Sequence, residues 1–114
     1  MNKIEEIKRN NYIKKLVSNA RAIISHQVAI PLGVVKMDKI IYWIENIKPI
    51  ETIDLKVFKE YNEKTHTFFI GSPRLSVEVQ FLLKEDEKLD KITEKFKKEI
   101  ILKCFEIIDQ FGES

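Results

Sequence analysis

The stretch LDKITEKFKKEIILKCFEIIDQF, residues 89–111, decides the fold because its apolar residues recur every three or four positions. This spacing is typical of an α-helix with one apolar face, and Gly112 follows where a helix commonly ends. The residues that we expect in the core along this face are Leu89, Ile92, Phe96, Ile100, Cys104, Ile107 and Phe111. Further apolar residues widen the face in its second half: Ile101, Leu102, Phe105 and Ile108. We therefore expect a long C-terminal helix that runs from solvent into the centre of a bundle.

Two helices are predicted near the N-terminus from the same periodicity. The first begins at an N-cap on Asn11 and continues to about Val28, while residues 2–9 add a short turn or fray. The second spans 34–47 and ends before Pro49, because the residue that precedes a proline avoids the α region. These two helices should pack against each other.

The middle of the chain is less uniform. Asp54 is expected to cap a third, shorter helix that closes near 62–65. Beyond it, the segment 66–83 combines a strand-like alternation with a Gly-Ser-Pro turn, so that it fits either a small hairpin or irregular chain followed by a helix. We favour the helix, since an isolated hairpin is marginally stable.

The predicted fold class is all-α, with one domain over residues 1–114 and a bundle of about four to five helices that includes the long C-terminal one. A chain of 114 residues has the usual size of a single domain. The alternative is an α+β fold with a small hairpin within 66–83.

Composition limits the location and the partners. One cysteine and no secretory signal indicate a cytoplasmic protein, and no apolar run is long enough to span a membrane. Twenty basic and eighteen acidic residues leave a net charge of +2, too small to indicate nucleic acid or an anionic membrane as a partner. No spacing of His and Cys predicts a metal site, no glycine-rich loop predicts a phosphate site, and no cofactor is expected.

Arg21 and His26 form the most chemical-looking pair of the chain. Their R-x4-H spacing resembles that of the helical ribonucleases called HEPN domains, which implies that Arg21 holds a phosphate and that His26 acts as an acid or base. Ala22 departs from that pattern, because a polar residue usually follows the arginine. The structural interpretation is a solvated Arg21 and a His26 that caps the helix end. We favour it, and we assign no catalytic residue.

The candidate partner-binding residues lie in the middle of the chain. His66 and Arg74 flank an apolar loop, and Glu85, Asp86 and Glu87 form an acidic block that fits either a solvated helix start or a docking edge. Cys104 lies on the apolar face of the last helix, where a core residue is expected rather than a nucleophile.

Three segments together resemble small bacterial proteins of the toxin-immunity type, including those of contact-dependent inhibition systems: ARAIISHQVAIPLGVVKM, HTFFIGSPR and LLKEDEKLDKITEKFKKEIILKCFEII. Phe69 stands where that pattern has a loop proline. The resemblance implies a non-catalytic cytosolic protein that binds and neutralises a cognate toxin domain, such as a nuclease. A HEPN-like ribonuclease and a helical adaptor or regulatory protein are the alternatives.

Overall fold

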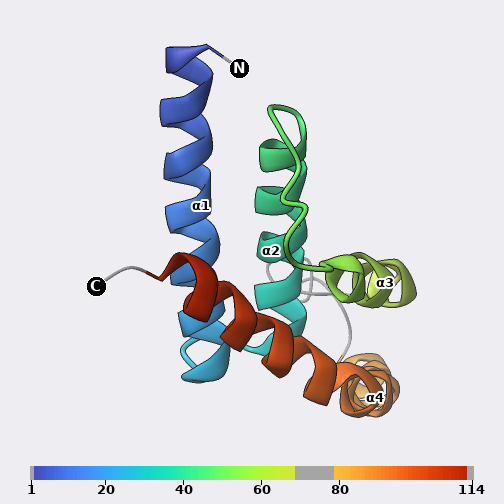
Figure 1. Ribbon diagram of the computed structural model, residues 1–114. Coiled ribbons are helices and arrows are strands. Elements are labelled where there is room, and N and C mark those ends of the chain that lie inside the picture. The colour runs from blue at the N-terminus through green and yellow to red at the C-terminus, as the bar shows by residue number, and fades with distance from the viewer. Residues whose placement is uncertain (1, 69–78, 113–114) are drawn as a thin grey trace.

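Helices account for most of the chain (Figure 1). The structure is a computed structural model and describes residues 2–68 and 79–112. Over these ranges there are four helices and no strand: α1 (Lys3–Ile24), α2 (Ile30–Glu45), α3 (Lys56–Thr65) and α4 (Val79–Phe111). The all-α prediction with a long C-terminal helix is confirmed. Of the segment considered for a hairpin, residues 79–83 are helical and residues 69–78 lie outside the described residues.

α1 and α2 form an antiparallel pair, and the other two helices pack against one end of it (Figure 1). Residues 46–55 return along α2 before α3 begins, and α4 crosses the lower half of α1. The upper half of α1 is left uncovered by α4, and Ile4 and Ile7 are exposed there. No helix among the described residues has the length and the apolar run to cross a membrane.

The predicted start of the first helix at Asn11 is wrong, because α1 begins eight residues earlier, at Lys3. Asn2 and Glu5 form a capping box: Asn2 Oδ1 accepts from the Glu5 amide at 2.8 Å, and Glu5 Oε1 accepts from the Asn2 amide at 3.3 Å. This reciprocal pair satisfies two amides at the helix start and fixes it there. Asn11 is an exposed residue inside the helix.

The starts of α2 and α3 also differ from the prediction. α2 begins at Ile30 rather than 34, because Pro31 lies in the first turn, where a helix does not need its missing amide. α3 begins at Lys56, whose amide donates to Asp54 Oδ1 at 3.0 Å, so the Asp54 side chain serves the helix start although Leu55 is the N-cap. The predicted end of this helix near 62–65 is confirmed at Thr65.

Gly33 brings α1 and α2 into close contact. A Cβ at this position would lie 2.6 Å from Ile23 Cγ1 and 3.2 Å from Val28 Cγ1, so only a glycine leaves room for these side chains. Asn19 Nδ2 on α1 donates to the Gly33 carbonyl at 2.9 Å. This glycine therefore allows two helices to pack tightly.

A single cluster of buried side chains draws on all four helices. Tyr61 is its largest fully buried member, and its hydroxyl lies 2.6 Å from Thr93 Oγ1 on α4. Phe96 packs edge-on to the Tyr61 ring at 5.7 Å but is only half-buried, short of the full burial that we expected. The cluster comprises Leu16, Val17, Ala20, Ile23, Val34, Met37, Ile40, Ile41, Ile44, Ile53, Val57, Phe58, Tyr61, Ile100, Cys104 and Ile107.

The expectation that α4 enters the centre of the bundle is wrong for its outer side. Ile100, Cys104 and Ile107 are fully buried, as predicted, but Leu102 and Phe105 each expose 53% of their surface. Among the described residues, α1, α2 and α3 all lie on one side of α4 and cover that side. The helix therefore lies across the bundle surface.

Candidate functional site

Arg21 and His26 are positioned by two different helix ends. The His26 backbone has a φ of 62°, in the left-handed region, directly after the C-cap of α1. The amides of His26 and Gln27 donate to the carbonyls of Ile23 and Ala22 at 3.3 and 3.0 Å, which is the bonding pattern of a Schellman motif. His26 is thus a helix-terminating residue with an exposed side chain.

Arg21 lies against the C-terminal end of α4 instead. It lines a groove of about 620 Å³ together with Phe111 and Gly112. Its Nη2 atom lies 2.9 Å from the place that a Cβ on Gly112 would occupy, so the guanidinium sits against the C-terminus of α4. A cation there interacts favourably with the negative end of the helix dipole. His26 is not among the described residues that line this groove, so the groove does not unite the R-x4-H pair.

The predicted partner-binding residues spread over two helices. His66 is the C-cap of α3 and is exposed, and its Nδ1 lies 2.6 Å from the Glu63 carbonyl oxygen. Arg74 lies outside the described residues. The acidic block is inside α4 rather than at its start, because the helix already begins at Val79.

The three acids of that block do not share one environment. Glu85 and Asp86 are half-buried, whereas Glu87 is exposed and its carboxylate lies 4.0 Å from Lys91 Nζ. Such a solvated pair contributes little to stability. Two exposed apolar side chains accompany the block, Phe81 and Leu83, at 46% and 63% exposure. The sequence analysis missed these two, although both lie four residues before an acid.

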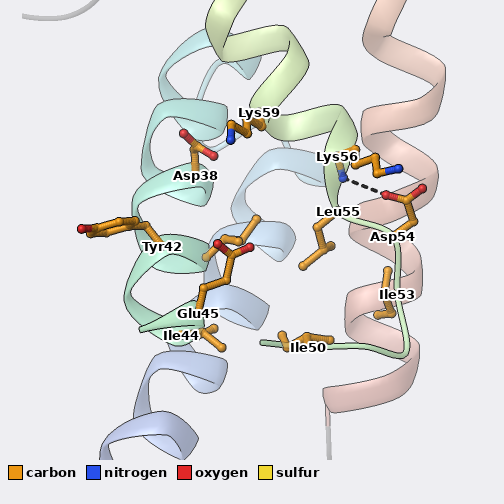
Figure 2. Close-up of a pocket in the computed structure, with 11 residues that line it drawn as sticks. Asp38, Tyr42, Ile44, Glu45, Ile50, Ile53, Asp54, Leu55, Lys56 and Lys59 are labelled. Atoms are coloured by element: carbon orange, nitrogen blue, oxygen red, sulfur yellow. Dashed lines mark hydrogen bonds between the residues drawn. The ribbon is translucent and has the colours of Figure 1, made fainter. Parts of the chain in front are cut away.

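A cleft of about 360 Å³ separates α2 from the returning segment and the start of α3 (Figure 2). Asp38 and Glu45 project from α2, seven residues apart and therefore on one side of the helix. Asp38 Oδ2 accepts from Asn62 Nδ2 of α3 at 3.0 Å, so this carboxylate joins two helices. The opposite wall includes Ile50 and Leu55.

The polar side chains that line this cleft are carboxylates, lysines and one tyrosine. Its size is at the lower end for small-molecule pockets, and the described residues that line it include no His, Cys or Ser to act as nucleophile or neutral-pH base. Sequence analysis missed it because the cleft forms only when residues 46–55 fold back along α2. The spacing of Asp38 and Glu45 was the one available signal.

A second groove, on the other side of α2, is basic. Lys15 of α1 and Lys36 and Lys39 of α2 line it, with no acid among the described lining residues. Trp43 forms one end, where its ring packs at a tilt against Tyr12 with centroids 5.5 Å apart. Although the net charge of the whole chain is small, these three lysines give the groove a local excess of positive charge. An anionic group would be favoured there.

Cys104 is a core residue, as the sequence predicted. Its side chain is fully buried, and this burial raises the pKa of the thiol to about 12. A thiol that stays protonated at neutral pH is a poor nucleophile. Among the described residues, no three His, Cys, Asp or Glu side chains gather in a way that could hold a metal ion.

Comparison with protein-family models, with curated proteins and with solved structures gave no significant match to the chain. Any functional argument must therefore be built from the chain's own residues.

Proposed function

We propose that the chain is a non-catalytic immunity protein that binds a cognate bacterial toxin domain and blocks it. The observation that carries the proposal is the surface of the first turns of α4. Leu83 is 63% exposed there and lies one turn before the exposed Glu87, while Phe81 and Glu85 form a second such pair on the opposite side of the helix. Protein interfaces typically consist of a few apolar or aromatic anchors surrounded by a polar rim.

The spacing along α4 couples the anchors to the acids. Phe81 and Glu85 are four residues apart, and so are Leu83 and Glu87, so that each apolar side chain has an acidic neighbour on its own side of the helix. An acidic rim complements the basic active site that a nuclease uses to hold phosphates. The acidic residues 85–87 would therefore inhibit the toxin domain by covering its active site. His66, at the end of α3, is a further candidate contact.

The ribonuclease alternative draws less support from the same geometry. It requires Arg21 and His26 to converge on one phosphate, whereas each is explained by its role at a helix end. The adaptor alternative differs from the immunity proposal only in the identity of the partner.

Co-expression with the C-terminal domain of the protein encoded immediately upstream of this chain tests the proposal. The wild-type chain should restore growth and co-purify with the toxin domain. Leu83→Asp and Glu87→Lys should each weaken binding about tenfold or more, since an anchor or a rim charge is lost. Ile7→Asp and Glu60→Lys, the same kinds of change at exposed positions on α1 and α3, are the matched controls and should bind normally.

Arg21→Ala and His26→Ala should leave protection intact, because neither residue performs chemistry under this proposal. The opposite result would overturn it. If the wild-type chain alone arrests growth, fails to co-purify, and loses its effect on either substitution, the ribonuclease alternative is correct.

A further inference from the structure

The second half of α4 has an apolar surface that no described helix covers. Leu102 and Phe105 are 53% exposed, and with Lys98 and Ile101 they line an open groove of about 400 Å³. At about 100° per residue, Lys98, Leu102 and Phe105 lie on the side of α4 opposite the buried Ile100–Cys104–Ile107 face, whereas Ile101 lies at the edge of that face and packs against the core. Exposed large apolar pairs of this kind mark interaction surfaces.

The order of residues along this outer face identifies the partner. Lys98, Leu102, Phe105 and Asp109 follow one another at intervals of four, three and four residues, which is the spacing of the contact positions in a coiled coil. All four side chains are exposed. A cation stands at one end and a carboxylate at the other, with two apolar side chains between them. When a second copy of the helix runs in the opposite direction, each charged residue meets one of opposite sign and each apolar residue meets an apolar one.

We infer that the outer face of α4 binds a second copy of this chain, with the two α4 helices antiparallel about a twofold axis. When the axis passes midway between Leu102 and Phe105, Leu102 faces the partner's Phe105 and Lys98 faces the partner's Asp109. Twofold symmetry makes each of these contacts twice. The inference concerns a different surface from the one proposed for the toxin domain, and it does not depend on that proposal.

Charge selects this register over its neighbour. In the proposed register the two charged residues centred on the outer face, Lys98 and Asp109, each face a residue of opposite sign. A shift of one turn sets Glu94 against the partner's Asp109 and separates Lys98 from its carboxylate. Like-charge opposition of this kind disfavours the wrong pairing. A helix from another protein could bind the apolar pair Leu102 and Phe105 without requiring a cation at one end and a carboxylate at the other. The charge order therefore favours a second copy of this chain.

The contact is small, because one helix face from each copy contributes to it. Interfaces of this size belong to weak, reversible complexes. The dimer should therefore form in the micromolar to millimolar range of protein concentration and dissociate on dilution.

Sedimentation velocity over that concentration range tests the inference. The mass of the wild-type chain should rise from monomer towards dimer. Leu102→Asp and Phe105→Asp should each remain monomeric with unchanged helical circular dichroism, since both positions are exposed. Lys39→Asp introduces the same aspartate at an exposed site on α2, away from the proposed interface. It is the control and should dimerise as the wild type does.

A charge exchange tests the partner and the register together. Lys98→Asp alone and Asp109→Lys alone should each weaken dimerisation, because each sets like charges against one another. The two substitutions in one chain should restore it, since every opposed pair is then again of opposite sign. A wild-type chain that stays monomeric at millimolar concentration would overturn the inference, and so would a double variant that fails to recover. Loss of toxin co-purification by Leu102→Asp with a monomeric wild type would assign the face to a foreign protein instead.

Discussion

Both sides of the second half of α4 carry apolar residues, but their surroundings are opposite. Ile100, Cys104 and Ile107 are fully buried against the bundle, whereas Leu102 and Phe105, one turn or less away, are half exposed to solvent. Both sets are large or apolar, and both repeat at helical spacing. The difference shows that apolar periodicity identifies the surfaces that a helix can bury. It does not say which of them this chain buries.

The largest contrast should come from truncating one residue on each side. Ile100→Ala removes fully buried methyl groups and leaves a cavity, so it should lower the free energy of unfolding by about 3 to 4 kcal/mol. Leu102→Ala should change it by less than about 0.5 kcal/mol in the monomer, where no cavity forms. The half-buried Phe96→Ala should fall between the two. Urea titrations at low protein concentration measure all three, and equal losses at Ile100 and Leu102 would abolish the distinction.

The buried side should also respond to alkaline pH through Cys104. Burial raises the pKa of this thiol from 9.0 to about 12, so above pH 9 the unfolded chain releases its proton before the folded chain does. The contribution of this thiol to the free energy of unfolding is therefore fully present below pH 9. It should fall by about 1.4 kcal/mol per pH unit as the pH rises from 9 towards 12.

Cys104→Ala should flatten this slope when unfolding is measured in urea at successive pH values. A smaller slope above pH 10 should persist in that variant, because burial also raises the pKa of Tyr61, partly offset by its hydrogen bond to Thr93. Identical pH profiles for the two chains would show that Cys104 is not sealed from solvent.

A third test concerns the helix pair that covers the buried side. Gly33→Ala adds a Cβ that would lie 2.6 Å from Ile23 Cγ1, and Ile23 is itself almost fully buried. The strain of this added methyl group should lower the unfolding free energy by about 1 to 3 kcal/mol. Thermal unfolding followed by circular dichroism measures the loss. A loss of less than about 0.5 kcal/mol would contradict tight packing of α1 on α2.

The smallest expected effect lies away from both sides of α4, at His26. A non-glycine residue in the left-handed region carries a steric cost of about 1 kcal/mol, which glycine avoids at some cost in chain entropy. His26→Gly should therefore stabilise the protein by about 0.5 to 1 kcal/mol in denaturant titrations. His26→Val should destabilise it, since a branched side chain fits this conformation poorly. A destabilised His26→Gly would mean that the imidazole makes contacts beyond a helix end.

Much of the fold was predictable because it follows from local patterns. The periodicity of residues 89–111 predicted the longest helix and its end before Gly112, and the position of Cys104 on that stripe predicted its burial. The start of α1 was missed although its signal, Asn2 followed by Glu5, was present in the sequence. Asn11 suggested a boundary as an N-cap residue, but exposed polar residues are tolerated inside a helix.

The candidate sites were less predictable, since they depend on contacts between distant segments. The cleft beside Asp38 forms only because residues 46–55 return along α2, and Arg21 approaches Gly112 only because α4 crosses α1. The acidic block 85–87 was visible in the sequence. The orientation of its members, two half-buried and one exposed, was not.

The sequence by itself determined that the described chain is helical and where most of the helices end, because helix formation depends on hydrogen bonds and apolar spacing within a few residues. Only the tertiary structure decided which apolar side of α4 is covered. That outcome depends on how many other helices are present and on which side they pack. With α1, α2 and α3 all on one side, Ile100 is shielded from water while Leu102 and Phe105 remain accessible to a partner.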